Sequence, residues 1–135
     1  MSKKCNLLIC DDEFGPRESL RMILKDKYDL LFAENGQQAV NQLMEQPVDL
    51  VLMDINMPRM SGIEALQKIK EIDKNVEVLV ITGYGSLDTA IQAMKYGAYD
   101  YITKPFDLNE ILKLVEKGID RRQASREHEG EDEKS

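Results

Sequence analysis

The sequence predicts an α/β domain built on a doubly wound parallel sheet of five strands, with helices on both faces. Short apolar segments alternate five times along the chain with segments whose apolar residues recur at helical spacing. Strict alternation of this kind is typical of parallel strands joined by crossover helices. The length of 135 residues suits one domain, which at this size buries an adequate core without disulfide bonds.

Strands are expected where a short apolar run is bounded by polar or turn residues. Such runs fall at residues 6–10, 28–33, 49–53, 76–81 and 99–102. The runs at 6–10 and 49–53 are the most continuously apolar. We therefore place these two strands at the centre of the sheet, where helices cover both faces.

Each strand run is followed by a helical pattern, so five helices are expected to flank the sheet. The patterns fall at residues 16–25, 36–45, 63–72, 87–95 and 108–121. In the first pattern Pro16 suits the opening turn of a helix, and Leu20 and Leu24 share one face. Turn residues at 56–61 and 83–86 predict loops.

The end of the chain differs in composition from the rest. Residues 122–135 are polar and lack apolar periodicity, which predicts a disordered tail or a truncated linker after a folded domain at 1–121. We expect no second folded domain.

Composition excludes several classes of function. The 25 acidic residues outnumber the 18 basic ones, and a net charge of −7 does not favour direct nucleic acid binding. No apolar run approaches the roughly 20 residues of a membrane span, and residues 1–4 lead into a strand instead of a signal peptide. Cys5 and Cys10 would point to opposite faces of one strand, so we expect no disulfide and a cytoplasmic location.

Polar residues stand where four of the predicted strands end. In an open parallel sheet, ligands bind beyond the carboxyl ends of the strands. Asp11 and Asp12 follow the first strand, Asp54 follows the third, Thr82 the fourth, and Lys104 comes soon after the fifth. One rim of the sheet is therefore expected to hold three aspartates, a hydroxyl and an ammonium group.

This set of side chains restricts the chemistry. Clustered carboxylates repel one another unless a cation joins them, and oxygen ligands without His or Cys favour Mg²⁺, Mn²⁺ or Ca²⁺ over zinc. One of the three carboxylates can itself act as a nucleophile towards phosphorus, while Lys104 and Thr82 bind the phosphoryl oxygens. Phosphoryl transfer to an aspartate is thus the reaction that these residue types fit.

The same residues resemble the receiver domain of response regulators in two-component signalling. The resemblance is carried by the Asp11–Asp12 pair, by VLMDINMPRMSG around Asp54, by Thr82-Gly83 and by YITKPF at 101–106. It covers about residues 5–121, and it implies a flavodoxin-like fold with strand order 2-1-3-4-5. The stretch AMKYGAYDYITKPF at 93–106 is similar both to receivers of enhancer-binding transcription activators and to single-domain phosphorelay receivers.

The resemblance implies a role for each rim residue. Asp54 would accept a phosphoryl group from a histidine kinase or phosphotransfer protein. Asp11, Asp12 and Asp54 would hold Mg²⁺ with the backbone carbonyl of Asn56, and Lys104 would pair with the phosphoryl oxygens.

The resemblance also implies a conformational switch. Thr82 would hydrogen-bond the phosphoryl group and Tyr101 would turn inward, which would reshape the surface at 87–121 and change partner binding, including a possible homodimer through that face. The bond before Pro105 would be cis.

Two other functions remain open from the sequence. The first is a Mg²⁺-dependent phosphatase with an aspartyl nucleophile, although Asn56 stands where such enzymes carry a second acid. The second is an interaction module that is never phosphorylated. The only histidine, His128, lies in the tail, so no Ser-His-Asp triad is expected in the folded part. We expect no enzyme in the usual sense, only catalysis of the chain's own phosphorylation and dephosphorylation.

Overall fold

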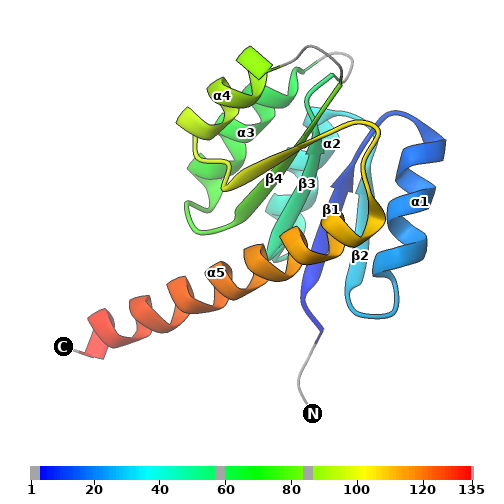
Figure 1. Ribbon diagram of the computed structural model, residues 1–135. Helices are drawn as coiled ribbons and strands as arrows, with labels where there is room; N and C mark the ends of the chain where they lie inside the picture. Colours follow the sequence, from blue (N-terminus) through cyan, green and yellow to red (C-terminus); the bar gives the residue numbers. More distant parts are fainter. Residues whose placement is uncertain (1–3, 57–59, 84–86, 135) are drawn as a thin grey trace.

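A parallel sheet of five strands, with the order β2-β1-β3-β4-β5, forms the centre of the molecule (Figure 1). The computed structural model describes residues 4–56, 60–83 and 87–134, with side chains up to residue 125. The strands are β1 (Asn6–Cys10), β2 (Asp29–Ala33), β3 (Leu50–Asp54), β4 (Glu77–Thr82) and β5 (Asp100–Thr103). The predicted fold class and strand order are confirmed, and β1 and β3 lie inside the sheet as expected.

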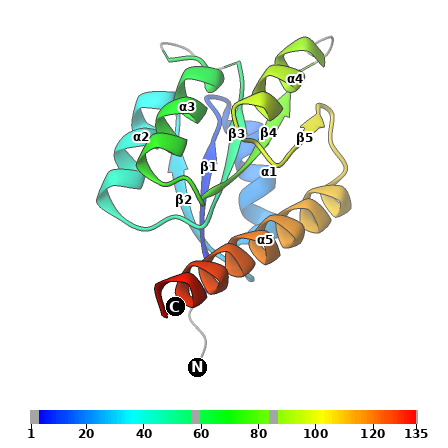
Figure 2. The same cartoon turned by 90° about the vertical axis from the view of Figure 1, so that its left-hand side faces the viewer.

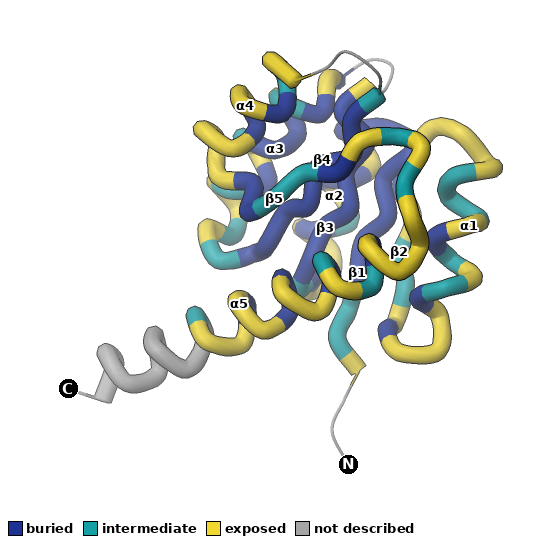
Figure 3. The backbone as a smooth tube through the Cα atoms, in the orientation of Figure 1, coloured by how far each residue is buried: buried dark blue, intermediate teal, exposed yellow. Residues whose placement is uncertain are grey.

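Helices cover both faces of this sheet. They are α1 (Phe14–Leu24), α2 (Gly36–Glu45), α3 (Gly62–Ile72), α4 (Leu87–Lys95) and α5 (Leu108–Lys134). One core cluster joins alternate strand residues such as Leu8 and Val51 to α2, α3 and α4. The other joins the intervening residues, such as Ile9 and Leu52, to α1 and α5. Figure 3 shows the result, with β1, β3 and β4 largely buried, the edge strands β2 and β5 partly buried, and the helices exposed on their outer faces.

The strand boundaries differ from the prediction in a way that matters for the site. Strands β3, β4 and β5 each lie one residue further along the chain than the apolar runs, so Asp54, Thr82 and Thr103 are the last residues of their strands. The apolar run marks burial, whereas the hydrogen-bonded ladder continues through the polar residue that ends it. The register pairs Asp54 with Ile81 and Thr82 with Thr103, which brings these strand ends to one level.

Helix α1 begins earlier than predicted, at Phe14 instead of Pro16. Proline is tolerated there because the N–H groups of a first helical turn have no partner within the helix. Helices α2 and α3 have side-chain caps, since Asn35 accepts from the Gln38 amide and Ser61 from the Glu64 amide. Of the predicted loops, residues 57–59 and 84–86 lie outside the described residues.

Residues 122–134, which were expected to form a disordered tail or a truncated linker, are described as a continuation of α5, which ends at Lys134 (Figure 1). Figure 2 views this helix from its C-terminal end. Residues 123–134 contain no proline and many good helix formers, and extending a helix costs far less than starting one. Arg122 anchors the last packed turn, since its guanidinium Nη2 lies 3.0 Å from Asp73 Oδ2. The polar residues at this end of the chain therefore continue the helix.

Two further expectations can be compared with the described residues. Cys5 and Cys10 are not joined by a disulfide. Among the helices in the described ranges, none is both long enough and apolar enough to cross a bilayer.

Candidate functional site

Three carboxylates meet at the carboxyl rim of the sheet. Within the described part of the chain, Asp11, Asp12 and Asp54 each offer an oxygen, and these three atoms lie within 4.8 Å of one another. Asp11 and Asp54 are buried, whereas Asp12 is exposed. The prediction that these three aspartates lie close together at one rim of the sheet is therefore confirmed.

Main-chain groups hold the two buried carboxylates in place. Asp11 follows β1, and its Oδ1 accepts a hydrogen bond of 2.9 Å from the Glu13 amide. Asp54 ends β3, and its Oδ1 accepts one of 2.9 Å from the Asn56 amide. In both residues the second oxygen, Oδ2, is left to face the other groups at the rim.

Close backbone contact shapes the loop after Asp54. A Cβ added to Gly62 would lie 2.6 Å from the Ile55 Cα and 3.1 Å from the Asp54 carbonyl oxygen. The Gly62 amide donates to the Ile55 carbonyl at 3.0 Å. Only glycine permits the start of α3 to pack this closely against the residue next to Asp54.

Lys104 reaches the two buried carboxylates from the far side of β4. Its Nζ lies 2.8 Å from Asp54 Oδ2 and 3.6 Å from Asp11 Oδ2. Its backbone amide donates to the Thr82 carbonyl at 2.7 Å, which extends the β4–β5 ladder by one bond. The Lys104–Pro105 peptide bond is cis, as expected.

Burial and charge shift the pKa values at this rim. Burial raises the pKa of Asp11, and the charges of Asp54 and Asp12 raise it further, against the Glu13 amide and Lys104, which lower it. Burial alone would lower the pKa of Lys104, but its hydrogen bond to Asp54 and the negative charges of Asp54 and Asp11 outweigh burial and raise it. The surroundings of Lys104 therefore favour its charged form, whereas the surroundings of Asp11 disfavour its ionised form.

Two buried polar atoms at the rim lack a hydrogen-bond partner among the described residues. They are Asp11 Oδ2 and Thr82 Oγ1, and both residues are fully buried. An unsatisfied buried polar atom costs about 1 to 3 kcal/mol. A carboxylate oxygen and a hydroxyl left open beside a lysine are suited to a cation and to an anionic oxygen respectively. The all-oxygen donor set fits a hard divalent cation.

The remaining predicted residues lie near this centre but are not all joined to it. Tyr101 is half-buried in β5, pairs in register with Val80, and packs against the core cluster beneath α2, α3 and α4. Asn56 is exposed, and the bond described for it is its amide donating to Asp54.

Sequence reasoning missed one residue that contacts the site. The Arg17 guanidinium, from α1, donates to the Asp11 backbone carbonyl at 2.9 Å. The available signal was an arginine one turn into the helix that follows the acidic pair, but side-chain donation to a main-chain carbonyl leaves no pattern in the sequence.

The chain belongs to the response regulator receiver domain family, whose model matches residues 7–116. This family defines receiver domains of two-component systems, as the sequence motifs implied.

The chain is also similar in sequence to several individual proteins. The chain is 40% identical over 112 residues to sporulation initiation phosphotransferase F of Bacillus subtilis, covering 82% of this chain and 90% of that protein. It is 45% identical over 109 residues to the response regulator protein PilR of Pseudomonas aeruginosa, covering 80% of this chain and 24% of PilR. The transcriptional regulatory protein ZraR of Escherichia coli is 37% identical over 115 residues, covering 84% of this chain and 26% of ZraR. The chain thus spans about a quarter of the length of PilR and of ZraR.

Solved structures agree with this assignment. A CheY-like receiver domain protein from Methanospirillum hungatei matches with a TM-score of 0.86 and 26% identity, over 91% of this chain and 99% of that one. NtrX from Brucella abortus matches with a TM-score of 0.88 and 28% identity, over 94% of this chain and 30% of NtrX. The chain is therefore similar to single receiver domains over their whole length and to larger regulators over their receiver part.

Proposed function

We propose that this chain is a phosphoryl-accepting signalling switch in which Asp54 takes a phosphoryl group from a histidine kinase or phosphotransfer protein. One observation carries the proposal: the buried Asp54 carboxylate is paired with Lys104 at 2.8 Å, beside an Asp11 oxygen that has no hydrogen-bond partner among the described residues. A nucleophile, a cation for the phosphoryl oxygens and an open oxygen ligand thus adjoin one another.

The acidic residues supply the metal side of the site. Asp11, Asp12 and Asp54, with the backbone carbonyl of Asn56, would hold Mg²⁺, or Mn²⁺ in its place. A divalent cation supplies charge neutralisation for the carboxylates and for the phosphoryl oxygens. Burial and the charges of Asp54 and Asp12 raise the pKa of Asp11, and a bound cation would counteract both effects.

The transfer itself needs little beyond positioning. An Asp54 carboxylate oxygen forms a bond to phosphorus while the bond from phosphorus to the donor histidine breaks. The imidazole nitrogen keeps the electron pair of the broken bond and takes a proton from solvent. Lys104 stays charged throughout, because Asp54 and Asp11 raise its pKa, and it pairs with the incoming phosphoryl oxygens.

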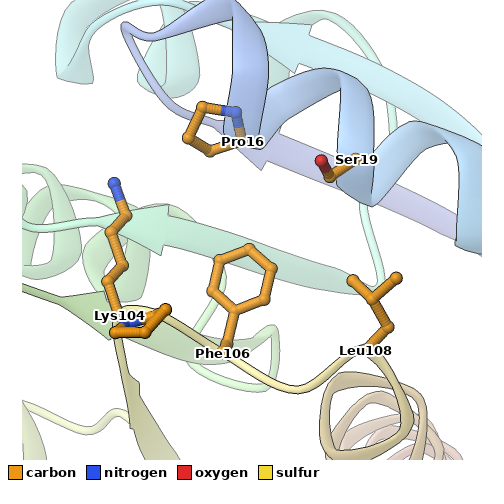
Figure 4. Close-up of a pocket in the computed structure, with 6 residues that line it drawn as sticks. Pro16, Ser19, Lys104, Phe106 and Leu108 are labelled. Atoms are coloured by element: carbon orange, nitrogen blue, oxygen red, sulfur yellow. The ribbon is translucent and has the colours of Figure 1, made fainter.

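A surface beside Lys104 suits the approach of a protein donor. Pro16 and Ser19 of α1 face Phe106 and Leu108 across a cavity that Lys104 and Pro105 complete (Figure 4). Its lining is mostly apolar and its edge carries the Lys104 ammonium group. A phosphorylated side chain delivered over this cavity would reach the rim next to Asp54.

Signal output would come from a population shift. Thr82 Oγ1 is buried without a hydrogen-bond partner among the described residues and could bond a phosphoryl oxygen, and Tyr101 of β5 pairs in register with Val80, two residues before Thr82. The surface at 87–121, where α4 exposes Leu87, Ile91 and Met94, would then change its partners, including a second copy of the chain. The names of two relatives, a sporulation initiation phosphotransferase and a transcriptional regulatory protein, suggest two settings for this switch: a chain of phosphoryl transfers, or a transcription regulator in which this chain is one part. We propose a cytoplasmic location for either.

The direct test is incubation with acetyl phosphate and Mg²⁺ followed by intact-protein mass spectrometry. One phosphoryl group should be added to the wild type and none to Asp54→Asn. Asp26→Asn, which changes an exposed aspartate in the turn after α1, should be phosphorylated like the wild type. Phosphorylation of Asp54→Asn to the wild-type level would overturn the assignment.

A second measurement separates the switch from a phosphatase. We expect no sustained turnover of p-nitrophenyl phosphate, because Asn56 cannot act as the second acid or base. Steady multiple turnover that depends on Asp54 would favour the phosphatase instead.

A further inference from the structure

Arg17 links three segments around the acidic rim. Its guanidinium Nη1 donates to the Asp11 carbonyl oxygen at 2.9 Å, and its Nη2 lies 3.8 Å from Glu34 Oε1 in the loop after β2. Its Cζ lies 5.9 Å from the centre of the Phe14 ring at the start of α1. Only 18% of the side chain is exposed, so this cation is held in one place instead of extending into solvent.

Helix α1 lacks the usual attachment to the loop that precedes it. Its N-cap residue, Glu13, makes no side-chain capping bond, whereas α2 and α3 are capped by Asn35 and Ser61. The described side-chain bond from α1 back into the β1–α1 loop is the one that Arg17 makes. Arg17 therefore ties α1 to the loop before it, as the capping side chains Asn35 and Ser61 tie α2 and α3 to theirs.

The carbonyl that Arg17 holds belongs to a particular peptide group. A peptide group is planar, so the Asp11 C=O and the Asp12 N–H turn together. The other two bonds of Asp11, from its amide to the Ala33 carbonyl at 3.1 Å and from the Glu13 amide to its Oδ1 at 2.9 Å, leave that plane untouched. The Arg17 bond holds the peptide group before Asp12, and the bond from the Glu13 amide to Asp11 Oδ1 holds the peptide group after it. Together the two bonds set the direction in which the Asp12 side chain leaves the main chain.

Repulsion among the three carboxylates is the reason why the position of Asp12 needs support. Asp12 is the exposed member of the three converging carboxylates, and repulsion from Asp11 and Asp54 pushes its carboxylate towards solvent. A charge-assisted hydrogen bond is about twice as strong as a neutral one, which suits it to resist that push.

We propose that Arg17 is a positioning residue: by holding the peptide group between Asp11 and Asp12, it aims the Asp12 carboxylate at the divalent cation. This inference rests on the proposed function. It assigns a role in metal binding to Arg17, which is not one of the side chains at the rim. Arg17 touches neither the cation nor the phosphoryl group and acts through Asp12.

The test measures the affinity of the metal site for Mn²⁺, from the electron paramagnetic resonance signal of free Mn²⁺ in a titration of the full chain. Arg17→Ala should weaken binding about tenfold, the lower end of what loss of a residue supporting a metal ligand costs. Arg21→Ala removes the same charge one turn later on α1, where it pairs with Glu18, and should bind like the wild type. An unchanged affinity in Arg17→Ala would overturn the proposal.

A double-variant cycle distinguishes positioning from general loss of structure. If Arg17 acts through Asp12, adding Arg17→Ala to Asp12→Asn should weaken Mn²⁺ binding no further. A full tenfold loss in the Asp12→Asn background would overturn the proposal. Should Arg17→Ala fail to fold, Arg17→Gln, which keeps one N–H donor, serves in both arms with a smaller expected loss. A wild type that binds no Mn²⁺ and accepts no phosphoryl group would sink the proposed function itself, a result distinct from either failure above.

Discussion

Lys104 and Asp54 are joined by a 2.8 Å hydrogen bond although β4 separates their strands in the sheet. Lys104 bridges β4 because its amide continues the ladder past Thr82 while its side chain turns over the strand end to reach Asp54. The pair is mostly buried, with 21% of the lysine side chain and 3% of the aspartate exposed. The end of β5 is thus tied to the proposed phosphoacceptor before any phosphoryl group arrives.

Lys104→Met should destabilise the metal-free protein at pH 7, because it leaves Asp54 and Asp11 without their shared cation. We expect a loss of about 2 kcal/mol in urea unfolding, below the 3 to 5 kcal/mol typical of a fully buried pair because Lys104 is partly exposed. In an Asp54→Asn background the same change should cost clearly less. Equal losses in both backgrounds would show that the pair contributes nothing to stability.

Asp11→Asn should stabilise the metal-free protein at pH 7. Burial, followed by the charges of Asp54 and Asp12, raises the folded-state pKa of Asp11 above the ordinary aspartate value of 3.8. The folded state then binds a proton more tightly than the unfolded state, so the stability of the wild type falls as pH rises through this window. We expect a gain of about 1 kcal/mol at pH 7 that declines as pH falls and is lost well below pH 3.8, where the carboxyl is neutral in both states.

Urea unfolding in EDTA at several pH values measures this gain, and Mg²⁺ supplies its control. A cation at the rim would remove the repulsion from the wild type and bind Asp11→Asn less well, so the advantage of the variant should shrink or reverse when Mg²⁺ is added. A gain that stays the same at every pH would contradict the stated role of Asp11 burial.

The sequence allowed the fold and most of the rim to be predicted, for physical reasons that particular residues illustrate. Apolar runs indicate strands because the strands of a sheet covered by helices on both faces must be apolar to be buried. Parallel strands bring their carboxyl ends to the same edge, so Asp11, Asp54 and Lys104 could be placed at one rim. The bond from Arg17 to the Asp11 carbonyl could not be predicted, because a main-chain acceptor is the same at every residue. Nor could the full length of α5, since its last turns are polar on all sides.

Gly62→Ala should destabilise the protein and impair phosphoryl uptake together. The new Cβ would lie 2.6 Å from the Ile55 Cα and 3.1 Å from the Asp54 carbonyl, so main chain must move beside the proposed acceptor. We expect a loss of about 3 kcal/mol in unfolding free energy, the upper part of the range for overpacking.

Gly15→Ala is the matched control for this change. Gly15 also lies near the start of a helix, but a Cβ there meets nothing within 4 Å. Alanine should therefore stabilise α1 by about 0.5 to 1 kcal/mol and leave phosphoryl uptake from acetyl phosphate unchanged. Similar stability losses in the two variants would show that glycine is needed at 62 for some reason other than close packing.

Thr82→Val should stabilise the unphosphorylated protein and weaken the response to phosphorylation. Thr82 Oγ1 is fully buried without a hydrogen-bond partner among the described residues, and valine replaces it by a methyl group of the same shape. Removing an unsatisfied buried hydroxyl should raise the unfolding free energy by about 1 kcal/mol. The same change deletes the proposed bond to the phosphoryl oxygen, so acetyl phosphate with Mg²⁺ should raise the unfolding midpoint less than in the wild type.

Thr82→Ser should show the opposite pattern, because it keeps the hydroxyl and loses the methyl group. Its unphosphorylated form should be less stable than the wild type by about 0.8 kcal/mol, the value of one buried methylene, while its gain on phosphorylation should be retained. Stability without phosphate and response to phosphate would then change in opposite directions at one side chain. A hydroxyl that serves the fold alone would make Thr82→Val less stable than the wild type and leave its response to acetyl phosphate intact.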